Sequence, residues 1–396
     1  MAKKIILIVL DGLGDRPIAG LGDKTPLEAA QTPNLDWLAE KGVCGLMTPV
    51  YQTAIPTSEE GHLSLLGYNI KKYPVKRGLF TASGAGIKMK KGDVALRGNF
   101  ATVDKDLKVI DRRAGRVDNT FPLIKDLDGM VIDGVKFLVR YASGHRVGIV
   151  LRGKGLSHRI SDGDPHYGKL EKGLRKIVPL DKSASAKFTA KVLNEFLDKA
   201  HSILDKHPFN AKRDLPANYI LVRGASPLVE LPSFKKKYGL KACCIAGKIL
   251  YQQIGKFSGM DLIKVEGANG LISTNLKGKI SAVKKALSKY DFVFLHIKAT
   301  DSLAEDGNYL GKKKFIEKID KSLKPLLELN ALIVVTADHS TCCNLKRHCK
   351  EPIPLLIYGD GADEVNRFSE KECRKGKLGK FSQLKLMSKA LSLYKK

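Results

Sequence analysis

Short apolar runs that end in an acidic or imidazole side chain constrain the fold more than any other sequence feature. IILIVL at 5–10 precedes Asp11, FVFLHIKAT precedes Asp301, and LIVVTA precedes Asp338 and His339. Continuous apolar strands of this length are typical of a parallel sheet that is covered on both faces. Because a membrane-spanning helix needs roughly 20 apolar residues, no membrane span is expected.

Strand-like and helical segments alternate at both ends of the chain. After the first strand we expect a Gly-rich turn and two short helices within 25–41, each opened by Thr-Pro. Further strands are expected in NYILVRGAS, KACCIAG, DLIKVEG, DFVFLHIKATD, ALIVVTADHS and IPLLIYGDG. This alternation predicts an α/β domain with a largely parallel sheet flanked by helices.

The middle of the chain has a different pattern. From about residue 75, short β-rich runs such as GDVALRGNFATVD and RVGIVLRG are separated by turn residues, which indicates an α+β segment. An amphipathic helix at about 185–206 leads back to alternating strands and helices. We therefore predict a discontinuous α/β domain of residues 1–74 and 185–396, with an α+β cap domain at 75–184 inserted into it.

The formal net charge of +28 allows two interpretations. Clustered Lys and Arg would indicate nucleic acid binding, whereas a lysine-rich surface also suits an enzyme that acts on a small anion. Most lysines are scattered singly or in pairs, and no aromatic-interleaved RNA motif is present. A nucleic acid partner is therefore not expected.

Seven cysteines include the adjacent pairs Cys243-Cys244 and Cys342-Cys343. Adjacent cysteines seldom bridge each other, and the spacing shows no disulfide framework. The sequence therefore predicts a reducing, cytoplasmic setting. It does not indicate the oligomeric state.

The acidic and imidazole groups that follow the apolar strands are candidate metal ligands. Parallel strands end on one edge of a sheet, so Asp11, Asp301, Asp338 and His339 could converge there, joined by His348. Carboxylates and imidazoles bind Zn, Mn or Mg ions. An aspartate after a strand can also be only a helix N-cap, but several such groups on one edge favour a metal site.

The stretch PTSEEGHLSLLGYN, at 56–69, raises a similar choice for Ser58. A capping box that begins at Ser58 would need Glu at position 61, where this chain has Gly61. Ser58 could still cap a helix. A serine nucleophile at a helix start would gain from the amide dipoles there.

Several motifs together carry a resemblance to a known family. In order, they are VLDGLGDRP, TPNLDWLAEKG, SEEGHLSLLGY, DRRAGR, ASGHR, DGDPH, TDSLAED, TADHST and HCKEPIPLL. Over nearly its whole length the chain resembles the archaeal-type cofactor-independent phosphoglycerate mutases of the alkaline phosphatase superfamily. The resemblance implies an alkaline-phosphatase-like fold and interconversion of 3-phosphoglycerate and 2-phosphoglycerate, in glycolysis and gluconeogenesis, through a phosphoserine intermediate.

The resemblance also implies two divalent metal ions. Ser58 matches the family's nucleophile and is a ligand of one metal with Asp11, Asp338 and His339. The other metal is expected at Asp301, His348 and position 305. The family usually has His at that position, whereas this chain has Glu305, which favours Mn or Mg over Zn or else weakens the second site.

Substrate and proton-transfer residues are expected in the middle segment. A doubly anionic substrate suits arginine, whose planar fork binds two oxygens. The substrate-binding candidates are Arg112, Arg116, His145, Arg146 and Arg223. Asp111, Asp164 and His166 are candidates for the general acid or base, whereas His62 and His296 are interpreted as packing or supporting residues.

Two alternatives remain from the sequence. One is a related phosphotransferase of the homoserine-kinase-like type, or a phosphatase, on the same metal core, although no P-loop is present. The other is a metal-depleted binding or structural protein, which retention of Ser58 and the Asp338-His339 pair disfavours. The expected partner is a small phosphorylated carboxylate.

Overall fold

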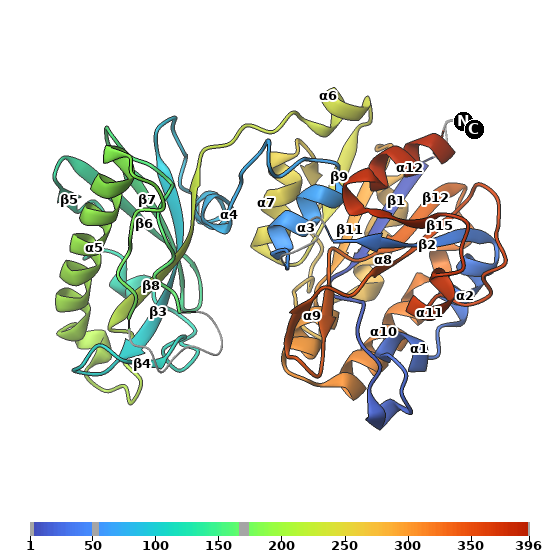
Figure 1. Cartoon of the computed structure of the whole chain (residues 1–396), viewed down its shortest axis with the longest axis horizontal. Helices are drawn as coiled ribbons and strands as arrows, with labels where there is room; N and C mark the ends of the chain where they lie inside the picture. The colour runs from blue at the N-terminus through green and yellow to red at the C-terminus, as the bar shows by residue number, and fades with distance from the viewer. Residues whose placement is uncertain (1–3, 50–54, 166–173, 395–396) are drawn as a thin grey trace. The chain divides into compact units, whose positions relative to one another are not determined.

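The computed structural model describes residues 4–49, 55–165 and 174–394. The chain divides into two units, one built from 1–73 and 231–396 and the other from 74–230 (Figure 1). Unit 1 and unit 2 each contain a sheet. No helix in the described ranges is long and apolar enough to cross a membrane.

Unit 1 is built on an eight-stranded sheet. The strands, in sheet order, are β10 (Asp261–Leu262), β9 (Ala242–Ile245), β11 (Phe292–Ile297), β1 (Lys4–Leu10), β12 (Ala331–Thr336), β15 (Ile353–Tyr358), β2 (Gly42–Thr48) and β16 (Gly379–Ser382). All neighbours pair in parallel except β15, which is antiparallel to β12 and β2. The predicted α/β class with a mostly parallel sheet is confirmed.

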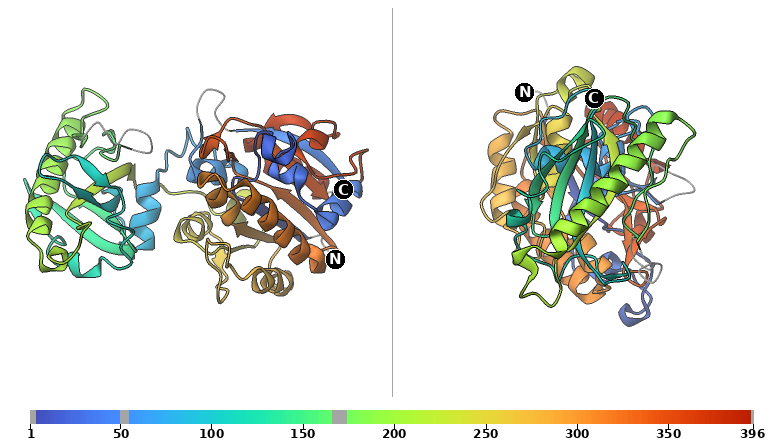
Figure 2. Two further views of the ribbon diagram at one scale, coloured as in Figure 1. Left: turned by 90° about the horizontal axis from the view of Figure 1, so that it is seen from below. Right: turned by 90° about the vertical axis from the view of Figure 1, so that its left-hand side faces the viewer.

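The apolar composition of β1 fits its central position. Ile5–Leu10 are at most 1% exposed, because β1 has strands on both sides and helices over its faces. The helices that flank the sheet are α1 (Pro26–Ala29), α2 (Pro33–Glu40), α3 (Ser58–Leu65), α6 (Phe234–Tyr238), α7 (Ile249–Phe257), α8 (Leu276–Ala286), α9 (Ala299–Glu305), α10 (Tyr309–Leu323), α11 (Glu370–Cys373) and α12 (Leu386–Tyr394) (Figure 2). The two short helices expected within 25–41 are present as α1 and α2, and Thr25 closes a capping box with Glu28.

Unit 2 has an antiparallel sheet covered by one long helix. Its strands are β3 (Val94–Val103), β4 (Val109–Asp111), β5 (Val131–Ile132), β6 (Val135–Ser143), β7 (Arg146–Arg152) and β8 (Tyr219–Pro227), and β3 pairs with both β7 and β8. The helices are α4 (Arg77–Gly84) and α5 (Ala184–Asp205). The apolar face of α5 joins the core of this sheet, where Phe196 stacks on Phe137 with ring centroids 4.2 Å apart.

The second boundary of the insertion differs from the one expected at 184. Both α5 and β8 had been assigned to the first domain, but they belong to unit 2, whose range extends to residue 230. Strand β8 pairs with β3, more than a hundred residues earlier in the chain. The sequence could not reveal this pairing, because an antiparallel partner at that distance leaves no local signal.

A short hairpin follows β12 and overturns the expectation that the cysteines are unbridged. It consists of β13 (Ser340–Cys342) and β14 (Arg347–Cys349), which form a separate two-stranded sheet. A disulfide joins Cys342 to Cys349, whose Cα atoms lie 5.9 Å apart. The adjacent Cys343 is free. The bonded cysteines therefore lie on the two strands of the hairpin and not at neighbouring positions in the sequence.

Candidate metal centre and arginine cluster

Three ligand candidates meet at the carboxyl ends of β1 and β12. The two strands pair in parallel up to Val9 and Thr336, so Asp11 and the Asp338-His339 pair follow at the same sheet edge. All three side chains are fully buried. His339 Nε2 lies 3.1 Å from Asp338 Oδ2 and 3.7 Å from Asp11 Oδ1, so these atoms could ligate one ion.

A second group lies beside the first and shares His339. Asp301 on α9 is buried, and its Oδ1 lies 3.5 Å from His348 Nε2 on β14. The imidazoles of His339 and His348 stack with centroids 3.6 Å apart. Glu305, one helical turn after Asp301, is 43% exposed, with its Oε1 4.0 Å from His348 Nε2.

Two glycines permit the close approach of the segments that carry these ligands. A Cβ at Gly12 would lie 2.4 Å from Thr341 Oγ1, and the φ of Gly12 is +64°. A Cβ at Gly61 would lie 2.6 Å from the carbonyl oxygen of Asp338. Gly61 therefore lets α3 pack directly against the loop that presents Asp338 and His339.

Ser58 is the first residue of α3, and it is 3% exposed. The N-cap is Thr57, whose backbone N–H donates to Glu60 Oε2 at 3.0 Å. The capping box thus begins one residue earlier than Ser58, so Ser58 is not the cap that the sequence had allowed. Its hydroxyl lies in the first turn, where the helix dipole favours negative charge.

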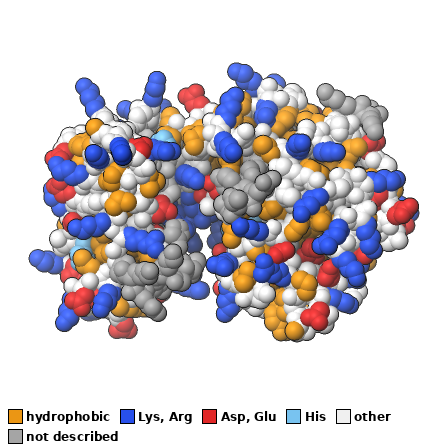
Figure 3. Space-filling model, in the orientation of Figure 1, with side chains coloured by type: hydrophobic (Ala, Val, Ile, Leu, Met, Phe, Trp, Pro, Cys, Tyr) orange, Lys and Arg blue, Asp and Glu red, His pale blue; other side chains and the backbone are white. Residues whose placement is uncertain are grey.

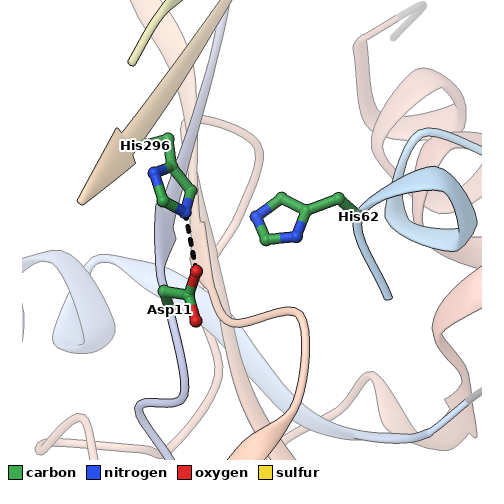
Figure 4. A group of neighbouring side chains, drawn as sticks. All are labelled: Asp11, His62 and His296. Carbon is green, nitrogen blue, oxygen red and sulfur yellow. Dashed lines mark hydrogen bonds and ion pairs between the residues drawn. The ribbon is translucent and has the colours of Figure 1, made fainter. Parts of the chain in front are cut away.

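His62 and His296, which the sequence analysis interprets as packing or supporting residues, contact the ligand candidates. His296 Nε2 hydrogen-bonds Asp11 Oδ2 at 2.9 Å, and His62 reaches toward the same group from α3 (Figure 4). His62 Nδ1 donates to the carbonyl oxygen of Ser58 at 2.7 Å and lies 3.0 Å from Asp338 Oδ2. His62 therefore connects the helix turn that carries Ser58 to a metal-ligand candidate.

Thr341 and Lys298 were not identified from the sequence. Thr341 Oγ1 donates to Asp301 Oδ1 at 2.6 Å, so it accepts from His339 Nδ1, 3.1 Å away. That pairing orients the Nε2 atom of His339 toward the ligand group. The Lys298 ammonium contacts both Asp11 and Asp301. Thr341 ends the TADHST motif, but nothing in that motif marks its hydroxyl as a partner of Asp301 and His339, and Lys298 lies outside the motifs that carry the family resemblance.

Burial and neighbouring charges shift the pKa values of the imidazoles in opposite directions. Burial lowers the pKa of His339, but the carboxylates of Asp338, Asp301 and Asp11 outweigh it and raise the value to about 9. Burial and then the nearby His339 lower the pKa of His348 to about 4. Burial likewise lowers the pKa of His296 to about 4, so His296 is neutral and donates to Asp11.

The donor set fits a divalent metal. Asp338 Oδ2 and His339 Nε2 are buried 3.1 Å apart, and neither makes a hydrogen bond of good geometry within the described parts of the chain. Buried polar atoms without such a partner are costly, and a cation between them would satisfy both. Mixed carboxylate and imidazole ligands are chemically suited to Zn, Mn and related divalent ions.

Unit 2 contains a cluster of arginines around His145. Burial, followed by the charges of Arg146, Arg97, Arg113 and Arg116, lowers the pKa of His145 to about 3. Cross-strand pairing in β3 places Arg97 opposite Arg223 and Asn99 opposite Arg146. Arg97 was missed because it lies outside the motifs that carry the family resemblance. Such a concentration of guanidinium groups suits an anion.

The acid–base candidates of unit 2 have different surroundings. Asp164 is fully buried, and Arg112 donates to its Oδ1 through Nε at 3.0 Å and Nη2 at 2.6 Å. Asp111 Oδ1 accepts the backbone N–H of Arg113 at 2.6 Å. His166 lies outside the described residues.

Comparisons with known proteins match one enzyme family over almost the whole chain. The model of the metalloenzyme superfamily matches residues 3–393. A 2,3-bisphosphoglycerate-independent phosphoglycerate mutase of Archaeoglobus fulgidus is 46% identical, covering 98% of this chain and 97% of the relative. A mutase of the same name from Methanocaldococcus jannaschii is 44% identical, covering 95% of this chain and 93% of the relative.

Solved structures show the same relationship. The PH0037 protein of Pyrococcus horikoshii superposes with a TM-score of 0.84 at 32% identity, covering 100% of this chain and 98% of that one. The cofactor-independent phosphoglycerate mutase of Thermoplasma acidophilum superposes with a TM-score of 0.69 at 37% identity, covering 99% and 100%.

Proposed function

We propose the reaction of this chain from its family. The chain belongs to the metalloenzyme superfamily and, within it, to the 2,3-bisphosphoglycerate-independent phosphoglycerate mutases. The chain is an isomerase that interconverts 3-phosphoglycerate and 2-phosphoglycerate, a step of glycolysis and gluconeogenesis. Its substrate is a small phosphorylated carboxylate.

Ser58 carries the phosphoryl group in this reaction. Its hydroxyl oxygen attacks the phosphorus, the bond from phosphorus to the substrate oxygen breaks, and a phosphoserine forms. The other hydroxyl of the same glycerate then takes the phosphoryl group back. The position of Ser58 in the first turn of α3 favours this role, because the N–H groups of that turn stabilise negative charge on the transferred group.

Two divalent metal ions complete the site. One would be held by Asp11, Ser58, Asp338 and His339, and the other by Asp301, Glu305 and His348. Bound metal of this kind lowers the pKa of a coordinated hydroxyl and offsets charge on phosphoryl oxygens. The extra carboxylate of Glu305 favours Mn or Mg over Zn.

The arginine cluster of unit 2 binds the anionic substrate. Arg112, Arg116, Arg146 and Arg223 supply the guanidinium groups, and neutral His145 supplies a hydrogen bond. Asp164 positions Arg112 through its paired hydrogen bonds, so Asp111 is the better candidate for proton transfer between the glycerate hydroxyls. His166 remains a second candidate.

The assignment rests most directly on one observation. Asp338 Oδ2 and His339 Nε2 are buried 3.1 Å apart and next to Asp11, and neither makes a hydrogen bond of good geometry within the described residues, which suits side chains that hold a metal ion. We infer a cytoplasmic location from the glycolytic reaction alone, because the Cys342–Cys349 bridge removes the argument from unbridged cysteines. Neither a nucleic acid nor a membrane partner forms part of the proposal.

The test is a ³¹P NMR time course with Mn-loaded protein and 3-phosphoglycerate, without 2,3-bisphosphoglycerate. We expect the 2-phosphoglycerate resonance to grow to equilibrium with the wild type and not with Ser58→Ala. Ser64→Ala is the matched control, because Ser64 lies in the same helix and its substitution should leave turnover intact. Absence of isomerisation, with Ser58-dependent hydrolysis of a simple phosphate ester, would instead assign a phosphatase or related phosphotransferase.

A further inference from the structure

The hairpin β13–β14 carries His348 on β14, and its hydrogen bonds to other parts of unit 1 include Thr341 N–H to the carbonyl oxygen of Gly14 at 3.0 Å and Lys312 Nζ to the carbonyl oxygen of Thr341 at 3.0 Å. It forms a two-stranded sheet that is separate from the larger sheets of the described chain. An isolated two-stranded hairpin is marginally stable in water. The position of His348 must therefore be fixed by contacts beyond its few ladder hydrogen bonds.

The two faces of the hairpin have different chemistry. Thr341 is directly opposite His348, and side chains alternate along a strand, so these two residues share one face. Thr341 hydrogen-bonds Asp301 and the His348 ring stacks on His339, so this face is turned toward the ligands. Cys342 and Cys349 share the opposite face, where both are buried and joined by the disulfide.

The disulfide lies next to the pair formed by Thr341 and His348 on the ligand-facing side of the hairpin. Cys342 follows Thr341, and Cys349 follows His348, so the disulfide limits sliding and separation of the strands at that pair. The Nδ1 atom of His348 also lies 3.1 Å from the carbonyl oxygen of Pro56. Glu305, the neighbouring candidate ligand, is considerably exposed, so the group relies on the placement of His348.

We propose that the Cys342–Cys349 disulfide positions His348 as a metal ligand, so that the affinity of the Asp301–Glu305–His348 group for a divalent metal depends on the oxidation state of this thiol pair. The inference rests on the proposed function, which assigns that group to the second metal. Reduction by a dithiol breaks the S–S bond by exchange: the cysteines become two thiols and the dithiol becomes a disulfide.

The bridge itself is tested first by counting thiols. Protein purified without reductant is denatured, alkylated and weighed by mass spectrometry, before and after treatment with dithiothreitol. We expect five alkylated cysteines before reduction and all seven after it. Seven alkylated cysteines in the unreduced protein would overturn the proposal.

The positioning role is tested by Mn²⁺ titration followed by electron paramagnetic resonance, which reports free metal without any turnover. In the double variant Cys342→Ser/Cys349→Ser, we expect one class of site to weaken by roughly 10- to 100-fold while the other keeps its affinity. Cys343→Ser is the matched control, because Cys343 adjoins the bridge but is free. Equal Mn²⁺ affinities in the wild type and the double variant would overturn the proposal.

A thermal melt separates positioning from simple stabilisation. If the bridge only stabilised the fold, the double variant would melt earlier but bind Mn²⁺ normally below its transition, which also counts against the proposal. If the double variant does not fold, the wild type reduced with dithiothreitol after metal removal is titrated instead. Because the readout is metal binding, a chain without mutase activity would still report the effect, so the two proposals fail separately.

Discussion

At the scale of single residues, the buried carboxyl of Glu370 couples folding to pH. Glu370 accepts the backbone N–H of Asp15 at 3.2 Å and the Thr25 hydroxyl at 2.8 Å. Asp15 in turn pairs with the fully buried Lys312, which donates to the carbonyl oxygen of Thr341. Burial and, to a lesser extent, the charge of Glu28 raise the pKa of Glu370 to about 7.

The raised pKa sets the sign of a pH effect. Between the ordinary glutamate value of 4.5 and the folded value of about 7, the folded state binds more protons than the unfolded state. The free energy of unfolding therefore falls as pH rises through this window and levels off above it. The Glu370→Gln variant should lack this pH dependence. In urea denaturation, the free energy of unfolding of the variant minus that of the wild type should therefore increase by about 1 to 3 kcal/mol from pH 5 to pH 8.

Glu372 provides a control on the same helix. It is partly exposed and pairs with Lys375, so Glu372→Gln should retain the pH dependence of the wild type. A Glu370→Gln protein whose stability changes with pH in parallel with the wild type would contradict the assignment of the effect to Glu370.

Residues also differ in how readily the sequence identifies them. Asp11, Asp338 and His339 were predictable, because polar groups after apolar parallel strands share one sheet edge. Thr341 was not, since its hydroxyl acts only through contacts with Asp301 and His339 that the hairpin creates. Arg97 was missed for a similar reason, because only strand pairing places it opposite Arg223.

At the scale of elements, the packing of α3 against the loop after β12 depends on the absence of a side chain at Gly61. A methyl group there would lie 2.6 Å from the carbonyl oxygen of Asp338, which is backbone and cannot rotate away. Gly61→Ala should therefore displace α3, and with it Ser58, relative to Asp338. We expect a loss of turnover of tenfold or more and destabilisation of about 1 to 3 kcal/mol.

The same helix contains a suitable comparison. Ser64→Ala adds no volume to α3, so its turnover and melting temperature should stay close to those of the wild type. The two variants are compared by steady-state kinetics and thermal denaturation. A Gly61→Ala enzyme with unchanged turnover would show that α3 does not set the position of the nucleophile.

Element boundaries show what local patterns miss. The short helices α1 and α2 were predictable because Thr-Pro marks a helix start, and Thr25 closes the capping box with Glu28. The unit to which α5 belongs was not predictable, because its periodicity indicates an apolar face without indicating the sheet that the face covers. The Cys342–Cys349 bridge likewise depends on the turn of the hairpin.

At the scale of the whole molecule, each unit has its own sheet, and the core of unit 2 is contributed by its own residues. Lys and Arg side chains are spread over the visible faces of the two units rather than collected in one block (Figure 3). This distribution agrees with the interpretation of the positive charge as a lysine-rich surface.

The separate cores lead to a prediction about folding. Unit 2 is continuous in sequence, so a polypeptide of residues 74–230 should fold alone. We expect a cooperative urea transition and dispersed amide resonances in its NMR spectrum. Phe196→Ala should destabilise this fragment by about 3 to 5 kcal/mol, because Phe196 stacks on Phe137 inside the core.

Whether unit 2 folds alone is decided by the NMR spectrum and the urea transition of the wild-type fragment. A collapsed NMR spectrum without a cooperative transition would show that unit 2 requires unit 1 for folding. An intact fragment also allows substrate-analogue binding by the arginine cluster to be measured without the metal centre.

The most direct test of the central claim is to detect phosphate on Ser58 during turnover. Mn-loaded protein is mixed with 3-phosphoglycerate, quenched in acid, digested and analysed by peptide mass spectrometry, with Ser64→Ala as a comparison. The account predicts a phosphorylated peptide with the modification on Ser58 in both proteins, and no such peptide when substrate is omitted. Isomerisation with no phosphate on Ser58 at any quench time, or with phosphate on another residue, would contradict it.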